Sequence, residues 1–261
     1  MVVARKRFGQ HFLHDRGVLD RIVQSLAPAP EDALVVIGPG HGALTERLVG
    51  KSATLDAIEI DRDLLAELRE RWGATPGFAL HGADALDFDF AALSKTRGRR
   101  LRVIGNLPYN ISTPLLFHVA AAHEHVVDLT VMLQKEVIDR IVAAPGSSDY
   151  GRLTVMLAPW FEATHLFDVG PGAFTPPPRV WSAVARLTVR REPAFAVPEA
   201  FARTVSAAFS QRRKTLRNAL RALMDVDAIV AAGIDPTLRP EVLSPADFAR
   251  LAANISGGAA E

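Results

Sequence analysis

Leu34-Val35-Val36-Ile37-Gly38-Pro39-Gly40-His41-Gly42 is a short apolar run that ends in three closely spaced glycines. An apolar run of this length, bounded by turn residues, is typical of a strand buried on both faces of a sheet. Glycine lets the backbone turn sharply and lets a ligand approach it closely. The stretch therefore predicts a strand, a turn and a helix, with the turn at the carboxyl edge of a parallel sheet, where open α/β folds bind ligands.

The same pattern repeats along the next hundred residues, as expected for βαβ units. Further apolar runs, which predict strands, lie at 53–60, 78–80, 101–104 and 129–133. Segments of helical spacing between or after them lie at 43–49, 63–72, 114–122 and 136–143. Two more predicted strands, at 161–169 and 182–189, flank a proline-rich loop and are expected to close the sheet.

The pattern changes after residue 192. From Pro198 onward the apolar residues recur only at helical spacing, as in Phe201/Val205/Phe209. We therefore predict an α/β domain with a Rossmann-like sheet at residues 1–192, followed by a small all-helical C-terminal domain at residues 193–261.

The composition excludes several kinds of protein. The chain has no cysteine, so disulfides, thiolate metal sites and thiol catalysis are excluded. No metal site is expected, because alternate residues of His123-Glu124-His125 point apart on a helix and no third ligand is evident. No apolar stretch approaches the roughly 20 residues of a membrane span. We therefore expect a cytoplasmic protein without membrane or metal partners, and we take it to be a monomer.

The basic residues are clustered, although the net charge is only +1. Local clusters of this kind are typical of phosphate-binding surfaces, although each is equally compatible with a solvated face. The clusters are Arg5-Lys6-Arg7, the segment 95–102, and the segment 203–221, which holds Arg212, Arg213, Lys214, Arg217 and Arg221 and no acidic residue.

A nucleotide-like cofactor is predicted at the glycine turn. Glu59 ends the next predicted strand, about 20 residues after Gly38, where a carboxylate accepts hydrogen bonds from ribose hydroxyls in nucleotide-binding α/β folds. Asp84 follows the third strand, at the position that faces an adenine ring. Gly38, Gly40 and Ala43 also satisfy the dinucleotide pattern, so these residues alone leave NAD open.

Asn106-Leu107-Pro108-Tyr109 directly follows the fourth predicted strand and carries the most specific chemistry. The exocyclic amine of adenine is a poor nucleophile because its lone pair is delocalised into the ring. The Asn106 amide oxygen and the carbonyl of Leu107 or Pro108 could accept the two amine hydrogens and localise that pair, while Tyr109 stacks on the base. No general base is then needed, because alignment with a methyl donor supplies most of the rate.

These motifs resemble those of the ribosomal small-subunit adenine dimethyltransferase family, in order and over nearly the whole chain. The matching blocks are residues 5–13, 37–40, 59–61, 105–112, 133–137, 174–180 and 209–215. The resemblance implies a class I methyltransferase that uses S-adenosylmethionine to dimethylate two adjacent adenosines near the 3′ end of small-subunit (16S) rRNA in a partly assembled 30S particle. It implies cofactor contacts at His11, Leu13, Gly38, Glu59, Asp84 and Asn106, with Gly40 in the same turn, and Phe174 facing Tyr109 across the target base.

Two positions depart from the family pattern. His11 stands where members usually carry Asn, a change that we expect to be tolerated. Val36 stands where members usually carry an acid near the methionine end of the cofactor, so we expect a glutamate there to tighten cofactor binding. Val36 also keeps open a non-catalytic RNA-binding assembly factor, and a large-subunit rRNA adenine methyltransferase is a further alternative.

The helical domain is predicted to dock the enzyme on ribosomal RNA. Arg213, Arg217 and Arg221 are spaced four residues apart, which would place them on one face of a single helix with Lys214 alongside. Such a row would contact phosphates rather than read base identity.

Overall fold

The computed structural model describes residues 11–108, 111–211 and 213–255. The chain divides into two compact units, one formed by residues 1–138 and 163–189 and the other by residues 139–162 and 190–261. The second unit contains the predicted C-terminal domain and also residues 139–162, which the prediction assigned to the first. Whether the functional division falls at residue 192 stays a prediction.

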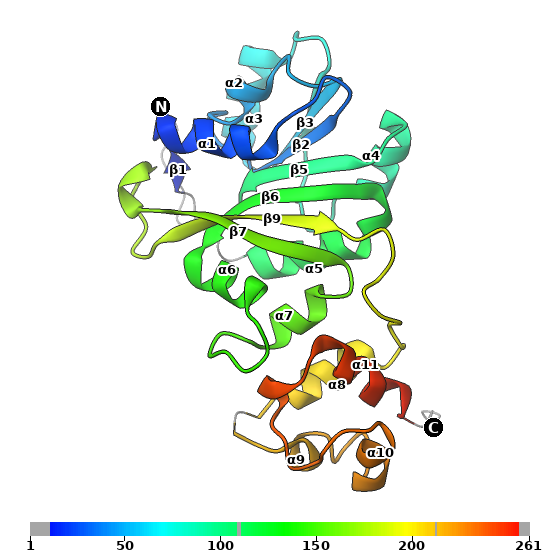
Figure 1. The fold of residues 1–261 in the computed structure, drawn as a ribbon. Coiled ribbons are helices and arrows are strands. Elements are labelled where there is room, and N and C mark those ends of the chain that lie inside the picture. The colour runs from blue at the N-terminus through cyan, green and yellow to red at the C-terminus, as the bar shows by residue number, and fades with distance from the viewer. Residues whose placement is uncertain (1–10, 109–110, 212, 256–261) are drawn as a thin grey trace. The chain divides into compact units, whose positions relative to one another are not determined.

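A seven-stranded sheet forms the centre of the first unit, in the order β4-β3-β2-β5-β6-β9-β7 (Figure 1). The pairs among the first five of these strands are parallel, whereas β9 runs antiparallel to β6. The strands are β2 (Ala33–Ile37), β3 (Thr54–Glu59), β4 (Phe78–Gly82), β5 (Leu101–Asn106), β6 (Val126–Gln134), β7 (Phe161–Val169) and β9 (Ser182–Val189). All seven predicted strands are present, and the α/β Rossmann-like fold class is confirmed.

Three helices of the first unit begin at aspartate side-chain caps. Asp15, Asp61 and Asp89 each accept a backbone N–H in the first turn, as preferred N-cap residues do. The elements are α1 (Arg16–Leu26), α2 (Thr45–Leu48), α3 (Arg62–Trp72), α4 (Phe90–Arg97), α5 (Ser112–Ala121) and the 3₁₀ turn His123–His125; α6 (Lys135–Val142) crosses into the second unit. Helices α1 and α4 were not predicted from the sequence.

A second, two-stranded sheet joins distant parts of the chain. β1 (Phe12–Leu13) pairs antiparallel with β8 (Phe174–Thr175), so that Leu13 lies opposite Phe174. Both side chains are buried in one apolar cluster with α1 residues such as Leu19 and with Val36 and Ile104 of the large sheet. The N-terminal segment and the proline-rich loop are therefore held beside the same face of the large sheet.

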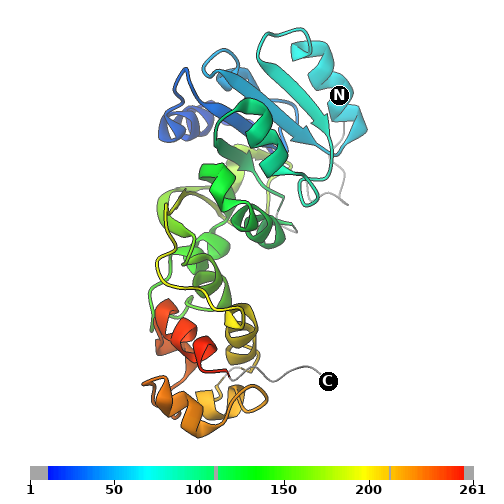
Figure 2. The same ribbon diagram turned by 90° about the vertical axis from the view of Figure 1, so that its right-hand side faces the viewer.

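The second unit is helical and has its own core. Its elements are α7 (Arg152–Leu157), α8 (Phe201–Ala208), α9 (Leu216–Ala219), α10 (Val226–Ala231), the 3₁₀ turn Pro240–Val242 and α11 (Pro245–Ala253). Phe201, Val205, Leu216, Phe248 and Leu251 are buried in one cluster. Helices α8 to α11, coloured yellow to red, form this group in Figure 2. The predicted helical character of this segment is confirmed.

The predicted helical row of arginines is wrong. Helix α9 contains only four residues, Leu216–Ala219, and of the three arginines only Arg217 belongs to it. Arg213 has a φ of 70°, in the left-handed region that a right-handed helix excludes, and Arg221 lies in the turn after α9. Residues spaced four apart share one face of a helix only where the helix spans all of them, and α9 does not.

The basic segment at 95–102 is used inside the protein. Each of its four arginines donates to a group of the first unit: Arg97 to Asp56, Arg99 to the Glu31 carbonyl, Arg100 to the Val126 carbonyl, and Arg102 to two carboxylates. Arg97 and Arg102 are therefore paired with carboxylates inside the protein, whereas Arg99 and Arg100 are exposed and donate to neutral carbonyls, so their positive charge is not neutralised.

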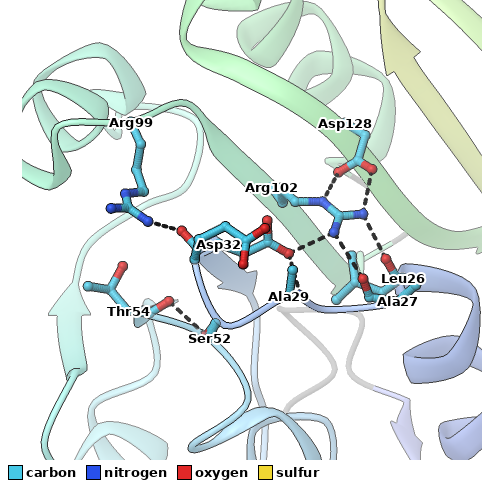
Figure 3. A network of polar contacts seen from close by, with 10 residues as sticks. Leu26, Ala27, Ala29, Asp32, Ser52, Thr54, Arg99, Arg102 and Asp128 are labelled. Carbon is cyan, nitrogen blue, oxygen red and sulfur yellow. Dashed lines mark hydrogen bonds and ion pairs between the residues drawn. The ribbon is translucent and has the colours of Figure 1, made fainter.

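Arg102 is the centre of this network (Figure 3). Its guanidinium donates to Asp128 at 2.8 Å and 3.0 Å, to Asp32 at 2.7 Å and to the Leu26 carbonyl at 2.7 Å. The last carbonyl belongs to the final turn of α1, so one side chain ties α1, the entrance of β2, β5 and β6 together. The side-chain hydrogen bond with Asp128 is the main cause of a raised Arg102 pKa, and the side chain is charged at every pH at which the protein folds.

Replacing Arg102 by Met should lower the free energy of unfolding by about 3–5 kcal/mol, because two carboxylates are left poorly compensated in a buried network. Arg102→Lys should recover only part of this loss, since an ammonium cannot reproduce the planar fork. Urea denaturation followed by circular dichroism measures both. The matched control is Lys95→Met, an exposed cation of the same segment, which should change stability by less than about 0.5 kcal/mol. Equal losses for Arg102→Met and Lys95→Met would contradict the role assigned to the network.

Candidate functional site

A cavity of about 280 Å³ opens at the carboxyl ends of β2, β3 and β5, close to the lower size limit of small-molecule sites. Its walls are largely apolar, with a few convergent polar groups. The lining includes His11, Phe12, Leu13, Gly38, Gly40, His41, Glu59, Ile60, Asp84, Asn106, Leu107 and Pro108. The cavity lies where the sequence predicted a ligand.

The glycine turn at the end of β2 requires its glycines. Gly38, Gly40 and Gly42 have φ values of 60°, 57° and 81°, which side chains other than glycine rarely adopt. A Cβ on Gly42 would also meet the Trp72 ring at 2.3 Å. The helix that follows, α2, has only four residues, so the long helix N-terminus that binds a dinucleotide pyrophosphate in Rossmann enzymes does not follow this turn. The NAD alternative loses its structural support.

Glu59 is one of two carboxylates that line the cavity, with Asp84, and is only 6% exposed. Its Oε1 accepts the N–H groups of Ile60 at 2.9 Å and Asp61 at 3.0 Å, and its Oε2 accepts the Gly40 N–H at 3.3 Å. Burial raises the pKa of this carboxyl, while the three backbone hydrogen bonds partly oppose the shift. Because a carboxylate has about four acceptor sites, Oε2 keeps room for a hydroxyl donor from a ligand.

Asp84 lines the same cavity from the loop after β4. Its Oδ1 accepts the Leu86 N–H at 2.9 Å, a local turn bond of the kind that loop aspartates form. The other carboxylate oxygen is not needed for this turn, so Asp84 can serve both the loop and a ligand.

Asn106 ends β5 at the rim of the cavity, and one bond decides how its amide is oriented. Its Nδ2 donates to the backbone carbonyl of His11 at 2.9 Å. The His11 ring in turn contacts the Pro176 carbonyl through Nδ1 at 2.7 Å. Since the amide nitrogen is engaged by the N-terminal segment, Oδ1 is the atom that remains for an acceptor role.

Gly105 allows Asn106 to reach this position. A Cβ on Gly105 would lie 2.6 Å from the Ile37 carbonyl oxygen and 2.9 Å from the Leu107 side chain. Strands β5 and β2 can therefore approach at the cavity only where residue 105 has no side chain, a requirement that the sequence contained but did not reveal.

The structure gathers most of the predicted site residues around this cavity. All seven predicted cofactor residues line it, and so do Leu107 and Pro108. Phe174 does not line it, because its side chain is 2% exposed and packs in the core cluster with Leu13. Tyr109 and the predicted RNA-binding residues Arg5, Lys6, Arg7 and Arg212 lie outside the described residues, so the roles assigned to them stay predictions.

Ile60 and His41 are two of the lining residues that were not predicted as site residues. Ile60 is 47% exposed directly after Glu59, an apolar side chain at the rim of the cavity. His41 contacts the Glu67 carboxylate at 2.9 Å and the Phe12 ring at a centroid distance of 4.5 Å. Neither residue was assigned a role from the sequence, although His41 lies in the glycine turn and Ile60 directly follows Glu59.

Val36 lies beneath the cavity and does not line it. Its side chain has no exposed surface and belongs to the apolar cluster that contains Leu13, Leu44 and Ile104. A glutamate at this position would have to enter that cluster, so the structure does not support the expectation that a carboxylate at residue 36 would meet a ligand directly. An apolar residue here is compatible with an intact cavity.

Solved structures of methyltransferases share this fold. A dimethyladenosine transferase from Plasmodium falciparum aligns with a TM-score of 0.77 at 24% identity over 92% of this chain and 96% of its own. The 23S rRNA methyltransferase ErmE aligns with a TM-score of 0.71 at 26% identity over 94% of this chain and 99% of its own. Fold and cavity therefore define a class I methyltransferase.

The chain belongs to the ribosomal RNA adenine dimethylase family, whose sequence model matches residues 1–256. It is 52% identical over 255 residues to the ribosomal RNA small subunit methyltransferase A of Pseudomonas aeruginosa, covering 97% of this chain and 95% of that one. The protein of the same name from Methylococcus capsulatus is 51% identical over 97% of this chain and 98% of its own. The chain is accordingly an S-adenosylmethionine-dependent methyltransferase enzyme.

Some findings concern what the structure does not contain. Within residues 11–108, 111–211 and 213–255, no helix is long and apolar enough to cross a membrane. In the same ranges, no three His, Cys, Asp or Glu side chains come together as metal ligands would.

Glu59→Gln should weaken S-adenosylmethionine binding by roughly 10- to 100-fold, on the scale of a lost hydrogen bond to a charged group. The new amide would direct N–H groups at the Gly40 N–H and at the ligand hydroxyl. Wild-type affinity should be constant near neutral pH and fall as the pH drops through the raised carboxyl pKa, since only the ionised form offers every acceptor; the variant should lack this acidic decline. Calorimetry at several pH values measures both. An unaltered affinity would place the ribose elsewhere.

Proposed function

We propose that this enzyme transfers methyl groups from S-adenosylmethionine to the N6 atoms of two adjacent adenosines near the 3′ end of small-subunit (16S) rRNA, dimethylating each in a partly assembled 30S particle. The observation that carries the proposal is the fixed amide of Asn106 at the rim of the cavity. Its nitrogen is held by the His11 carbonyl, which directs the acceptor role to Oδ1.

Similarity favours the small-subunit substrate over the large-subunit alternative. The relatives that are about half identical to this chain carry the small-subunit name, whereas the 23S rRNA methyltransferase shares 26% identity. The non-catalytic alternative rested on Val36, and the buried position of Val36 beneath an intact cavity removes its main support.

The cavity residues have distinct tasks in cofactor binding. S-adenosylmethionine, when bound, supplies an electrophilic methyl group on a sulfonium centre. Glu59 accepts from a ribose hydroxyl through Oε2, and Asp84 accepts from the adenine amine of the cofactor. The glycine turn leaves its backbone open to the ligand, and the apolar lining excludes water.

The target adenine is activated by acceptors at the end of β5. Asn106 Oδ1 takes one hydrogen of the N6 amine, and a backbone carbonyl takes the other, which localises the nitrogen lone pair. The Pro108 carbonyl already accepts the Ile111 N–H at 3.2 Å, so the Leu107 carbonyl is the better second acceptor. We assign stacking on the base to Tyr109 and no base contact to Phe174, which is buried in the core cluster.

RNA docking is assigned to basic residues outside the cavity. Arg213, Lys214, Arg217 and Arg221 belong to the second unit; they lie in the turns on either side of α9 and in α9 itself. Without a continuous helix they do not form a straight row, but phosphate contacts require local positive charge rather than helical order. Arg5, Lys6, Arg7 and Arg212 complete the proposed RNA-binding set.

Asn106→Ala should lower kcat for methyl transfer by about 10²- to 10³-fold, the scale for losing one transition-state hydrogen-bond partner. Transfer of labelled methyl groups from S-adenosylmethionine to under-methylated small subunits measures this, with naked 16S rRNA and large subunits as parallel substrates. The control is Asn254→Ala, which also removes an amide-to-carbonyl bond of 2.9 Å, in the second unit. It should leave kcat within about twofold. If the wild-type enzyme methylates large subunits and not small subunits, the proposed substrate is wrong. If Asn106→Ala has the same kcat as the wild-type enzyme, the proposed base-activation step is wrong.

Reversing Arg213 and Arg217 to Glu should weaken binding to small subunits and flatten its salt dependence, since each lost phosphate contact removes about 0.7–0.9 from the slope of log affinity against log salt. Sedimentation of the enzyme with small subunits at several salt concentrations measures the slope. The matched control reverses Arg62 and Arg69, two exposed arginines of α3. Should both double variants show the same slope, the docking surface lies elsewhere.

A further inference from the structure

Residues 179–181 form an exposed segment at the same sheet edge as the cavity. Arg179, Val180 and Trp181 are all exposed, and Ser182, where β9 begins, is fully buried. Trp181 is 56% exposed and is the only exposed aromatic side chain among the described residues. A large aromatic surface left in water calls for an explanation, because burying it elsewhere would stabilise the fold.

The backbone of this segment is firmly placed. The Trp181 carbonyl accepts the Lys135 N–H at 2.9 Å, directly where α6 follows β6. Ser182 pairs with Gln134 in the β6–β9 ladder. The Trp181 ring lies against Gly170, where a Cβ would be 3.7 Å from it. The ring is therefore presented to solvent from a rigid position rather than from a free loop.

The ladder also sets how far Trp181 lies from the target-base site. Asn106 of β5 pairs with Met132 of β6, and Met132 pairs with Val184 of β9. Asn106 and Val184 therefore lie on strands that are separated by one strand. Trp181 lies three residues before Val184. At about 4.8 Å between strands and 3.3 Å per residue, the separation from Asn106 is on the order of 14 Å. At about 3.4 Å per stacked nucleotide, a single RNA strand covers this in about four nucleotides.

The charge around Trp181 suits a polyanion. Arg179 has no carboxylate partner in the part of the chain that the structure describes. The nearby Asp168 is neutralised, because it contacts His165 at 2.7 Å and Lys135 at 3.4 Å. The hydrogen bond from His165 is the main cause that holds the pKa of the Asp168 carboxyl below its ordinary value, so this acid stays paired.

We propose that Trp181 stacks on an unpaired base of the RNA substrate, a few nucleotides from the target adenosine, and that Arg179 contacts the adjoining phosphate. This inference rests on the proposed rRNA substrate. It adds a second contact between the enzyme and the RNA strand, outside the cavity. Stacking on an aromatic side chain is tolerant of sequence, so Trp181 would hold the strand in register rather than read a base.

The test compares Trp181→Ala, Trp181→Phe and Trp181→Leu by their Kd for under-methylated small subunits, measured by sedimentation, and by KM and kcat for methyl transfer. Trp181→Ala should raise Kd and KM by about 5- to 150-fold, the range for losing one base–aromatic stack, and leave kcat and S-adenosylmethionine affinity within about twofold. Trp181→Phe should restore most of the affinity and Trp181→Leu little. Val230→Ala, which trims a 57% exposed apolar side chain of α10, is the control and should change nothing.

Each other outcome overturns the inference. Unchanged Kd and KM in Trp181→Ala would show that the ring does not touch the substrate. Full rescue by Trp181→Leu would indicate an apolar protein surface instead of a base, and a change of oligomeric state in Trp181→Ala would indicate a second copy of this chain. A wild-type enzyme that binds small subunits without methylating them would instead refute the proposed function, while the Kd comparison would still decide the role of Trp181.

Discussion

The hydrogen bond from Asn106 Nδ2 to the His11 carbonyl is the contact on which the site depends. It joins the end of a central strand to a segment 95 residues earlier in the chain and commits the two ends of the amide to different roles. The same N-terminal segment continues into β1, which pairs with β8. One short stretch thereby fixes the acceptor at the cavity, contributes lining residues and anchors the proline-rich loop.

The hydrogen-bond and ion-pair partners of a basic residue, rather than its neighbours in the sequence, decide what its charge does in this protein. In the segment 95–102, Arg97 and Arg102 hold carboxylates of other segments, while Arg99 and Arg100 donate to backbone carbonyls. Asp56 shows the same balance: burial alone would raise its pKa, but hydrogen bonds from His81 and Arg97 outweigh that effect and keep the pKa below its ordinary value. Exposed cations without a carboxylate partner in the described residues, such as Arg179, are the ones that we propose to contact RNA.

Burial and hydrogen bonding have opposite effects on the charged form of the Glu59 carboxylate. Burial makes its charged form costly, whereas the N–H groups of Gly40, Ile60 and Asp61 stabilise that form and hold the side chain in one rotamer. Because the glycine turn supplies one of these donors, the turn and the acid at the end of the next strand form a single hydrogen-bonded unit.

The sequence by itself determined the alternation of strands and helices, the position of the glycine turn, and the placement of Glu59, Asp84 and Asn106 at strand ends. These follow from local periodicity and turn chemistry, and parallel strands then bring their carboxyl ends to one edge whatever the loops do. Helix α1 was missed because it precedes the first strand of the large sheet and so lies outside the repeating βαβ pattern, and the predicted arginine row was wrong because spacing cannot show where a helix stops. Only the tertiary structure decided the His11–Asn106 bond, the burial of Phe174 and Val36, the partners of Arg102 and the exposure of Trp181. Each of these depends on segments far apart in sequence, where packing and desolvation, rather than local propensity, set the outcome.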